Sequence, residues 1–460
     1  MITLPQEFSV IRSLMPPDEQ LFLVGGAVRD AILSKPNQDL DFVCAGDPRI
    51  IGRKLAEKLS GAFFMLDDER NACRVIAKND QGARIVFDFT QMRGLALKED
   101  LLERDFTINA MAVDLDHPLD VIDPLNGSLD LKEKWLRPCK TNSFNDDPLR
   151  VIRAVRYAVK YGLNLESKTI DLLKEAVKGL NIVSKERKRD ELFKILELDQ
   201  PWIALELLEQ YGILSHLGLN GFPDKKQAYL RLKMLAAIID TLNNAKKGVE
   251  TKDTKLSFLG SLFSESRLFL LDRLNQVNQS ERSIHALDAL IALIWDLDEV
   301  EGSKAADGLA LSREEQDQIS VCLRHKCCII DQFSSQQIPD RKFIYRYYQS
   351  MGVAGVDMAL LTLVESASES SMEWNPDRWS TLAMFCQKLV EAWIFNPDYI
   401  NPKLLLTGRD LMFEFDIPQG PRIGLILDGL REEQAIGTIQ NHTQALAWVD
   451  AQLQKGFISG

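Results

Sequence analysis

Hydrophobic and polar residues follow two different periods along this chain. From residue 21 to about residue 139, short apolar runs of strand length recur between breaks rich in glycine, proline and asparagine. From about residue 140, apolar positions fall mostly three and four residues apart, which is the spacing of amphipathic helices. The pattern predicts an α+β protein in which a small mixed sheet is followed by a mostly helical remainder.

The N-terminal part opens with a strand, a turn and a helix. Residues 21–24 are apolar, Gly25 and Gly26 follow, and residues 28–34 have helical spacing up to a proline–asparagine break. A second strand is expected over residues 39–44. Beyond it, the pattern predicts a helix over 48–60, strands over 62–66, 72–78 and 83–90, a helix over 99–112, and a strand running into a turn over 121–127.

The helical part contains two segments with well-marked starts. Asn145 or Asp146 is expected as the N-cap of a helix that has Pro148 in its first turn. A second, basic helix is expected over residues 184–197. Three polar segments are expected as loops, namely 243–255, 298–308 and 365–378. No catalytic constellation stands out between the basic helix and the C-terminal segment.

Composition narrows the class of protein. Of the 460 residues, 45% are hydrophobic and 27% are charged, as in ordinary globular proteins. No apolar run approaches the ~18 residues that span a bilayer, and the N-terminus lacks the basic and apolar regions of a signal peptide. We therefore expect a cytoplasmic protein with no membrane partner. The seven cysteines show no CxxC spacing, which favours free thiols over disulfides or structural zinc.

The charge pattern excludes little. A net charge of −12 argues against nucleic-acid binding through bulk charge, but local patches decide that property. Much of the acid lies in the C-terminal half. None of the five histidines is followed by aspartate, which argues against an appended His-Asp phosphohydrolase domain.

Two aspartates stand two residues apart on the predicted strand over 39–44. Asp39 and Asp41 would point to one face, about 6–7 Å apart at Cα. Aspartate is disfavoured in strands, and two neighbouring carboxylates repel each other unless something pairs them. Mg²⁺ can pair them, because it accepts one or two carboxylates together with phosphate oxygens. The alternative is an exposed edge strand with solvated aspartates.

The glycine pair before these aspartates suits a phosphate. The backbone at Gly25 and Gly26 can approach an anion closely, and the N–H groups at the start of the next helix favour one. Asp88 alternates with Phe87 and Phe89, so it points away from the apolar face and is a candidate third carboxylate or base. A simple chain reversal at the glycines and a solvated Asp88 are the alternatives.

A further group of candidates begins the predicted helix after residue 145. Asp147, Arg150, Arg153 and Arg156 recur at intervals of three, so Asp147 and Arg150 would lie nearly on one face. A carboxylate accepts from an exocyclic amine, and a guanidinium donates to a ring nitrogen or carbonyl. Such a pair would accept cytosine and adenine and reject uracil and guanine. An Asp–Arg pair exposed to solvent is the alternative.

Five motifs in fixed order carry a family resemblance. They are LFLVGGAVRD with DLDF, ERDFTINAMA, DPLNG, DDPLRVIRAVRYA and SKERKRDELFKIL, spread over about 180 residues. The chain resembles the class II (bacterial-type) tRNA nucleotidyltransferase and poly(A) polymerase family of the polymerase-beta superfamily. The segment TGRDL with GPRIGLIL also resembles that family's C-terminal end. Residues 215–400 match by position only.

The resemblance implies an order of domains and a reaction. The domains would be a nucleotidyltransferase head over 1–139, a helical neck that reads the base over 140–215, a helical body over 216–395 and a helical, RNA-binding tail over 396–460. The reaction would be Mg²⁺-dependent, template-independent transfer of nucleotides from CTP or ATP to the 3′ end of tRNA, with release of pyrophosphate.

The resemblance also implies roles for single residues. These are Gly25, Gly26 and Arg29 at the triphosphate, Asp39 and Asp41 at the metal ions with Asp88 as a third carboxylate, Arg104, Asp105 and Asn109 at the ribose or phosphates, Asp147 and Arg150 at the base edge, and Arg153 and Arg156 in support of that helix or of the triphosphate.

Three departures from the family pattern bear on the product. Glu103 stands where the family often has arginine, and Asp146 where it usually has glutamate. Only FTQMRGLALKEDLLE separates Asp88 from Arg104, whereas full CCA-adding members usually carry a longer flexible loop. The short connection resembles the CC-adding members, which stop before the terminal A and would act with a separate A-adding enzyme. CC addition is therefore expected first, full CCA addition second, and A addition or polyadenylation third.

Two rival classes are disfavoured. A non-catalytic RNA-binding relative is disfavoured because Asp39, Asp41, Asp147 and Arg150 are all present. A nucleotidyltransferase that acts on small molecules or proteins would share only the head, and the base-reading helix and the RNA-type tail argue against it.

Overall fold

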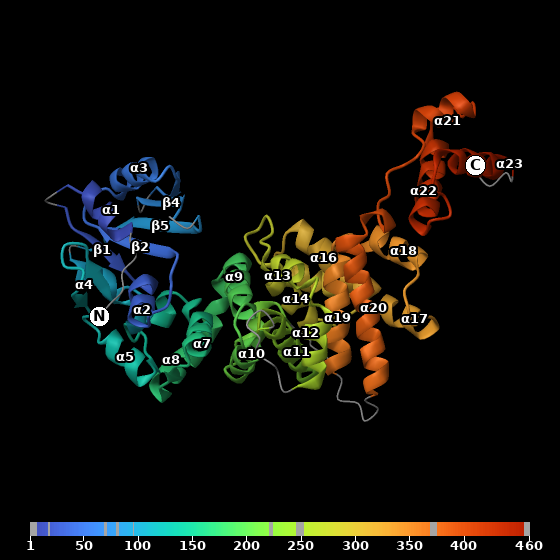
Figure 1. Ribbon diagram of the computed structural model, residues 1–460. Coiled ribbons are helices and arrows are strands. Elements are labelled where there is room, and N and C mark those ends of the chain that lie inside the picture. The colour runs from blue at the N-terminus through green and yellow to red at the C-terminus, as the bar shows by residue number, and fades with distance from the viewer. Residues whose placement is uncertain are drawn as a thin grey trace. The chain divides into compact units, whose positions relative to one another are not determined.

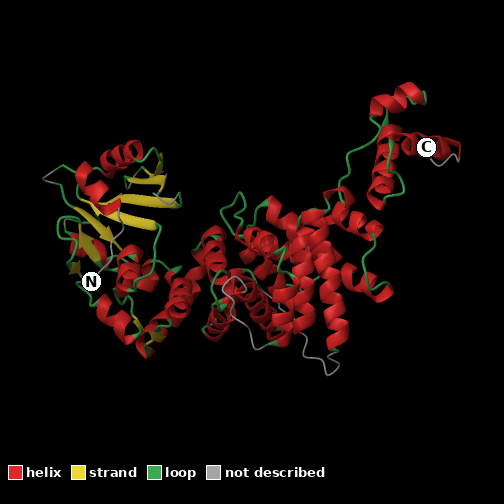
Figure 2. Ribbon diagram, in the orientation of Figure 1, coloured by secondary structure: helices red, strands yellow, loops and turns green. Residues whose placement is uncertain are grey.

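The computed structural model describes residues 7–16, 19–68, 71–79, 82–94, 96–219, 224–244, 253–368 and 375–454. The chain forms two compact units. The first comprises Met1–Glu191 with Ile203–His216, and the second comprises Leu192–Trp202 with Leu217–Gly460. Within the described ranges, every strand belongs to the first unit (Figure 2). The predicted α+β class is confirmed.

The first unit is built on a mixed seven-stranded sheet. Its order is β3-β4-β5-β2-β1-β6-β7. The strands are β1 (Leu21–Val24), β2 (Asp39–Cys44), β3 (Ala62–Asp67), β4 (Ala72–Lys78), β5 (Arg84–Gln91), β6 (Ala112–Asp114) and β7 (Val121–Ile122). Strands β2 and β5 run parallel, and the other neighbouring pairs are antiparallel. Helix α3 (Pro48–Lys58) packs over β4 and β5, with α1 (Glu7–Leu14) beside it (Figure 1).

The two faces of this sheet differ in polarity, as the sequence alternation predicted. Leu40 and Phe42 of β2 are buried, and the Phe42 ring stacks on Phe89 of β5 with centroids 5.2 Å apart. Asp39 and Asp41 point to the opposite face and are exposed. The apolar face therefore packs the core, and the polar face is left for chemistry.

The remaining elements of the first unit are mostly helical. They are α2 (Gly26–Ile32), α4 (Leu97–Leu102), η1 (Thr107–Asn109), α5 (Gly127–Glu133), α6 (Ser143–Asp146), α7 (Arg150–Tyr161), α8 (Ser167–Ala176), η2 (Val177–Ile182) and η3 (Leu214–Leu217), together with a small sheet of β8 (Trp135–Leu136) and β9 (Asn164–Leu165). The chain passes between the units within α9 (Lys185–Leu196) and α10 (Pro201–Gln210).

The helix predicted over residues 99–112 is wrong. Helix α4 ends at Leu102, residues 107–109 form a single 3₁₀ turn, and Ala112 already belongs to strand β6. The reason is tertiary, because β6 pairs with β1 and thereby satisfies backbone groups along that strand. A local apolar period cannot reveal such a partner.

The helix start predicted at Asn145 or Asp146 is also displaced. Helix α6 ends at Asp146, Asp147 is extended with φ −145° and ψ 99°, and α7 begins only at Arg150. Pro148 explains the break, because a residue that precedes proline is forced out of the helical region. The two helices therefore meet at a corner, with Asp147 at its apex.

The second unit is helical throughout its described residues. Its helices are α11 (Lys225–Asn244), α12 (Thr254–Leu262), α13 (Arg267–Asn275), α14 (Ile284–Leu293), α15 (Glu299–Gly308), α16 (Arg313–His325), α17 (Cys328–Ser335), α18 (Arg341–Met351), α19 (Ala354–Ser368), α20 (Pro376–Phe395), η5 (Pro397–Tyr399), α21 (Gly408–Glu414), α22 (Pro421–Ile436) and α23 (His442–Gln454). Buried arginines tie the helices together, since Arg231 pairs with Asp296 and Glu365, and Arg273 pairs with Asp357.

The loops predicted in this unit have mixed outcomes. The loop over 298–308 is wrong, because a capping box between Asp298 and Glu301 starts helix α15 there. The central parts of the other two, 245–252 and 369–374, lie outside the described residues. Helix α22 begins at Pro421, directly after Gly420.

The seven cysteines are free thiols, and four of them are buried. Taken singly, no helix of the described chain combines the length and the apolar character needed to cross a bilayer. The pair α18 and α19, which bends by 106°, reaches both only when its two helices are counted together.

Candidate active site

A cleft of about 410 Å³ opens on the polar face of the sheet in the first unit. Its walls come from the β1–α2 turn, strands β2 and β5, the connection from β5 to α4, the segment 103–109, and the starts of α7 and α9. Of the site residues predicted from the sequence, all but Asp39 and Arg156 line it, namely Gly25, Gly26, Arg29, Asp41, Asp88, Arg104, Asp105, Asn109, Asp147, Arg150 and Arg153.

The β1–α2 turn requires glycine at its first position. Gly25 has φ +71°, where other residues are strained, and its N–H donates to the Met111 carbonyl at 3.1 Å. A Cβ atom on Gly25 would lie 2.7 Å from Nη1 of Arg104 and 3.8 Å from Oδ2 of Asp41. The turn therefore sits close to a guanidinium and a carboxylate, and it leaves backbone rather than side chain facing the cleft.

Two carboxylates stand side by side at the base of the cleft. Asp41 of β2 and Asp88 of β5 are register partners in neighbouring parallel strands. Asp88 accepts two hydrogen bonds from Arg74 of β4, each 2.8 Å long. Asp39 lies on the same face of β2 as Asp41, but outside the cleft lining. Asp88 faces away from the apolar side of the sheet, as its alternation with Phe87 and Phe89 predicted, and it is also ion-paired with Arg74.

The surroundings of Asp41 suit a cation. Asp41 keeps contact with solvent on its cleft side, but the protein packed around its carboxylate reduces its hydration. This loss of hydration raises the pKa of Asp41 to about 6, the neighbouring charges of Asp88 and Asp39 act in the same direction, and Arg104 opposes them. A divalent cation would stabilise the charged carboxylate, and its preferred ligands are carboxylate oxygens of this kind. Within the described residues, no three His, Cys, Asp or Glu side chains converge as a complete set of metal ligands.

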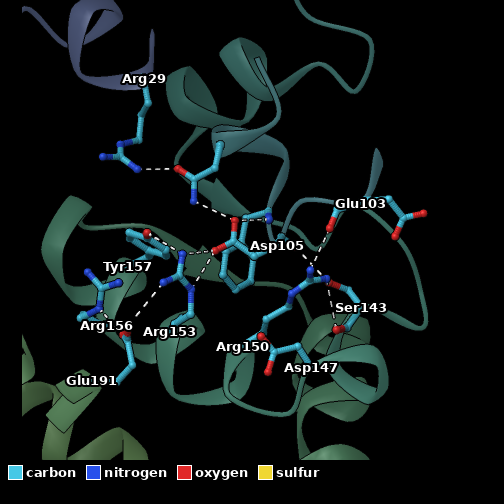
Figure 3. Close-up of polar contacts among 12 residues, drawn as sticks. Arg29, Glu103, Asp105, Ser143, Asp147, Arg150, Arg153, Arg156, Tyr157 and Glu191 are labelled. Carbon is cyan, nitrogen blue, oxygen red and sulfur yellow. Dashed lines mark hydrogen bonds and ion pairs between the residues drawn. The ribbon is translucent and has the colours of Figure 1, made fainter. Parts of the chain in front are cut away.

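A buried network of polar side chains crosses the back of the cleft (Figure 3). The Arg29 guanidinium donates to Oδ1 of Asn109, and the Asn109 amide donates to Oδ1 of Asp105 at 3.0 Å. Arg153 donates to Oδ2 of Asp105 through Nε at 2.9 Å and Nη2 at 2.6 Å. Arg153 also reaches Glu191 of α9 at 3.4 Å. This network of hydrogen bonds joins α2, the 103–109 segment, α7 and α9.

The charged residues of this network are held in their ionised forms by the partners they bind. Burial by itself would raise the pKa of Asp105, but Arg153 and the hydrogen bonds from Asn109 and the Phe106 N–H outweigh it, so that the pKa lies below its usual value. Arg156 donates to Glu191 at 2.7 Å and is buried away from the cleft. Asp105 and Arg156 therefore hold other residues in place, Asp105 at the cleft wall and Arg156 away from it.

Arg29 is held more tightly than the sequence suggested. Its side chain is buried, donates to Asp30 at 2.9 Å, and stacks 4.3 Å from the Tyr161 ring centroid. Arg104 is more open, because the only hydrogen bonds of its guanidinium within the described residues are long ones, 3.2 and 3.3 Å, to Asp100. Of the two arginines, Arg104 has more freedom to meet a ligand.

Asp147 and Arg150 both line the cleft, but each pairs with other residues. Asp147 accepts from Nη2 of Arg187 at 3.0 and 3.2 Å, so the basic helix α9 packs against this corner. Arg150 donates through Nη1 to the Ser143 hydroxyl at 2.7 Å and through Nη2 to the Glu103 carbonyl at 2.8 Å. These contacts hold both side chains in place at the cleft, and those of Arg150 are drawn in Figure 3.

Comparison with known proteins agrees with this geometry. The family model described as "Poly A polymerase head domain" matches residues 21–137. The model described as "Probable RNA and SrmB- binding site of polymerase A" matches residues 162–220. The chain is 30% identical over 429 residues to the CC-adding tRNA nucleotidyltransferase of Geobacter sulfurreducens. This match covers 92% of this chain and 90% of that protein. The chain belongs to the class II tRNA nucleotidyltransferase and poly(A) polymerase family.

Two more relatives of this family extend the comparison. The CC-adding tRNA nucleotidyltransferase of Synechocystis is 27% identical over 444 residues, covering 95% of this chain and 94% of that protein. A solved CCA-adding enzyme in complex with ATP has a TM-score of 0.62 and 23% identity, covering 98% of this chain and 96% of that chain. The likeness to the solved structure shows a shared fold, and the family membership predicted from the motifs is confirmed.

Family membership makes the protein a nucleotidyltransferase, as predicted. Its cleft also contains residues that the motifs did not single out. Arg93, Tyr157 and Arg187 line it beside the predicted residues. The sequence marked Arg187 only as part of a basic helix, and Arg93 carried no motif, although its place shortly after a strand and directly before Gly94 was a usable signal.

Proposed function

We propose that the protein adds two cytidine nucleotides from CTP to the 3′ end of tRNA, releases pyrophosphate, and leaves the terminal A to a separate enzyme. The observation that carries the choice of product is the short connection after the carboxylate strand. Strand β5 ends at Gln91 and α4 begins at Leu97, so there is no room for a long loop. Two relatives that match the chain over nearly its whole length are named CC-adding enzymes, which supports the same choice.

Base selection is proposed to rest on Asp147 and Arg150. The contacts of Arg150 to Ser143 and Glu103 leave its Nε–H and one Nη2–H to donate to a base. The Asp147 carboxylate keeps lone pairs that can accept from the exocyclic amine of cytosine. Uracil and guanine present a carbonyl at that position, which would face the carboxylate without a proton between them.

The cation is proposed to be Mg²⁺. Members of the family generally use a divalent metal, and Asp41 with Asp39 would hold it. When bound, such a cation activates the 3′-hydroxyl and screens the charge on the leaving pyrophosphate. The Gly25 turn and Arg104 would hold the triphosphate, and the buried Asp105–Arg153 pair keeps the base-reading helix at a fixed position relative to that turn. We place the reaction in the cytoplasm.

Arg150→Ala is expected to relax nucleotide choice. The variant loses a guanidinium contact to the base edge, and such contacts discriminate by about 1–3 kcal/mol. The preference for CTP over UTP, measured as the ratio of kcat/KM values, should fall by about 10- to 100-fold. The ratio for Arg150→Lys should lie between those of the wild type and Arg150→Ala. An unchanged ratio in Arg150→Ala would refute the base-reading role.

Transfer itself is tested with tRNA that lacks its 3′ CCA. Incubation with Mg²⁺ and CTP should lengthen it by two nucleotides, and ATP alone should add none. Omission of Mg²⁺ with a chelator should stop the reaction. If neither nucleotide is incorporated under any of these conditions, the proposed function is wrong, and a non-catalytic RNA-binding protein becomes the better description.

A further inference from the structure

Arg93 is a positively charged residue of the cleft to which the proposed function assigns no role. It lies two residues after the end of strand β5, is exposed, and lines the cleft together with Glu103 and Arg104. Within the described ranges, its guanidinium has neither an ion pair nor a side-chain hydrogen bond; the only hydrogen bond of Arg93 is made by its backbone. The residue therefore presents a full positive charge to the cleft.

The backbone at Arg93 is anchored, which fixes the position from which its side chain extends. The Met92 N–H donates to the Cys44 carbonyl at 2.9 Å, and the Arg93 N–H donates to Oδ1 of Asp100 at 3.2 Å. Gly94 then turns the chain at φ +78°, and a Cβ atom there would collide with the Glu99 side chain. The turn is thus specified by the sequence at and around Arg93.

Asp100 couples this anchor to the rest of the site. It is buried, with 3% of its surface exposed, and its second oxygen, Oδ2, accepts from Arg104 at 3.2 Å. One buried carboxylate therefore holds the backbone of Arg93 and the guanidinium of Arg104. The two arginines are placed next to each other by the same group.

The pairing of the other cations makes Arg93 distinct. Six arginines and five acidic residues line the cleft, although the whole chain has a net charge of −12. The other five arginines each bind a neighbour, namely Arg29 with Asp30, Arg104 with Asp100, Arg150 with Ser143, Arg153 with Asp105 and Arg187 with Asp147. Within the described part of the chain, the Arg93 guanidinium has no hydrogen-bonded or ion-paired neighbour of this kind, although the charge of Glu103 lies near enough to interact with it. A guanidinium of this kind, on a fixed backbone, suits a phosphate, which it can bind through two parallel hydrogen bonds.

We propose that Arg93 is a phosphate-binding residue through which the short β5–α4 connection holds substrate in the cleft. The ligand is a phosphate oxyanion, supplied by the triphosphate of the incoming CTP or by the RNA backbone next to the 3′ end. The inference rests on the proposed function for the identity of these two substrates. The connection that is short in this chain thus contributes a binding group of its own.

Three variants test the proposal. Arg93→Ala removes the charge, Arg93→Lys keeps it without the planar fork, and Arg84→Ala removes an exposed arginine from the far end of the same strand, outside the cleft. Because Arg93 is exposed, all three should fold with the melting temperature of the wild type. We expect Arg93→Ala to weaken one substrate about tenfold, Arg93→Lys to recover part of that loss, and Arg84→Ala to match the wild type.

Two binding measurements without turnover identify the source of the phosphate. Calorimetry with CTP and Mg²⁺ in the absence of RNA reports the triphosphate, and fluorescence anisotropy of tRNA lacking CCA in the absence of CTP reports the backbone. Weaker CTP binding assigns Arg93 to the triphosphate. Weaker tRNA binding, with a salt dependence reduced by about one phosphate contact, assigns it to the RNA.

The result that overturns the proposal is an Arg93→Ala variant that binds both ligands within about twofold of the wild type. Failure of the proposed function would look different. A wild-type protein that binds CTP or tRNA but transfers no nucleotide would refute CC addition, and the comparison of Arg93→Ala with the wild type would still decide whether Arg93 binds phosphate.

Discussion

Replacing Asp41 with asparagine should abolish nucleotide transfer and lower kcat by at least about 10³-fold. The expectation follows from its place, because Asp41 lies at the base of the cleft, beside Asp88 and close to the Gly25 turn. A carboxylate that holds a catalytic cation contributes several kcal/mol to stabilising the transition state, and about 4 kcal/mol corresponds to a thousandfold in rate. Single-turnover incorporation of labelled CTP measures the loss. Binding of tRNA should stay within about threefold, since Asp41 is not proposed to contact the RNA.

Stability separates this role from a structural one. The pKa of Asp41 is raised to about 6, above its unfolded value, so ionisation of Asp41 costs stability progressively as the pH rises through the range from about 4 to 6. Without Mg²⁺, Asp41→Asn should therefore melt at or above the wild-type temperature at pH 7.5. With Mg²⁺, only the wild type should gain stability. Asp68→Asn, outside the cleft, should behave as the wild type in every assay. A wild-type rate in Asp41→Asn would refute the metal assignment.

Arg153→Met should destabilise the first unit more than any other single change in the site. Arg153 is the ionic partner of Asp105, and it also reaches Glu191, and both carboxylates are buried. Removing one member of a buried ion pair costs about 3–5 kcal/mol, because the remaining charge is left without compensation. Glu191 keeps Arg156, whereas Asp105 keeps only neutral donors, Asn109 and the Phe106 N–H. The apparent melting temperature should fall by roughly 6–15 °C at pH 7.5.

The pH dependence and a second substitution test the cause of this loss. The folded-state pKa of Asp105 lies below its usual value, so the pair contributes stability above the ordinary carboxylate pKa of about 3.9 and loses it as the pH falls further. The difference between Arg153→Met and the wild type should therefore shrink at low pH. Adding Asp105→Asn to Arg153→Met should restore part of the stability. Arg313→Met, which removes an exposed ion pair with Asp317, should shift the melting temperature by less than about 2 °C. An equal loss in Arg313→Met and Arg153→Met would contradict the buried-pair explanation.

The parts of the site that were predictable are those set by short-range periods. Alternation along 39–44 and 83–90 placed Asp39, Asp41 and Asp88 on one face, because side chains in a strand alternate whatever the rest of the fold does. The glycine turn was predictable in the same way, since few other residues tolerate its backbone angles. Together with the motif order, these features predicted the sheet, the cleft lining and the family.

The parts that were missed depend on partners distant in the sequence. Arg74 pairs with Asp88 from 14 residues away, and Arg187 pairs with Asp147 from 40 residues away. No local period contains such a pairing. The helix over 99–112 failed for the same reason, since Ala112 pairs with Val24 of β1 in the sheet. The displaced start of α7 has a local cause, because Pro148 disfavours a helical backbone at Asp147.

The most direct test of CC addition supplies both nucleotides at once. Purified protein, Mg²⁺, CTP and ATP are incubated with tRNA that lacks CCA, and the mass of the 3′-terminal fragment is measured over time. The short β5–α4 connection predicts a product that gains two cytidines and then stops, and a tRNA already ending in CC that stays unchanged with ATP. Completion of CCA on the first RNA would contradict the assignment and make the protein a full CCA-adding enzyme. Addition of A to the tRNA ending in CC, with no growth of the first RNA, would also contradict it and make the protein an A-adding enzyme.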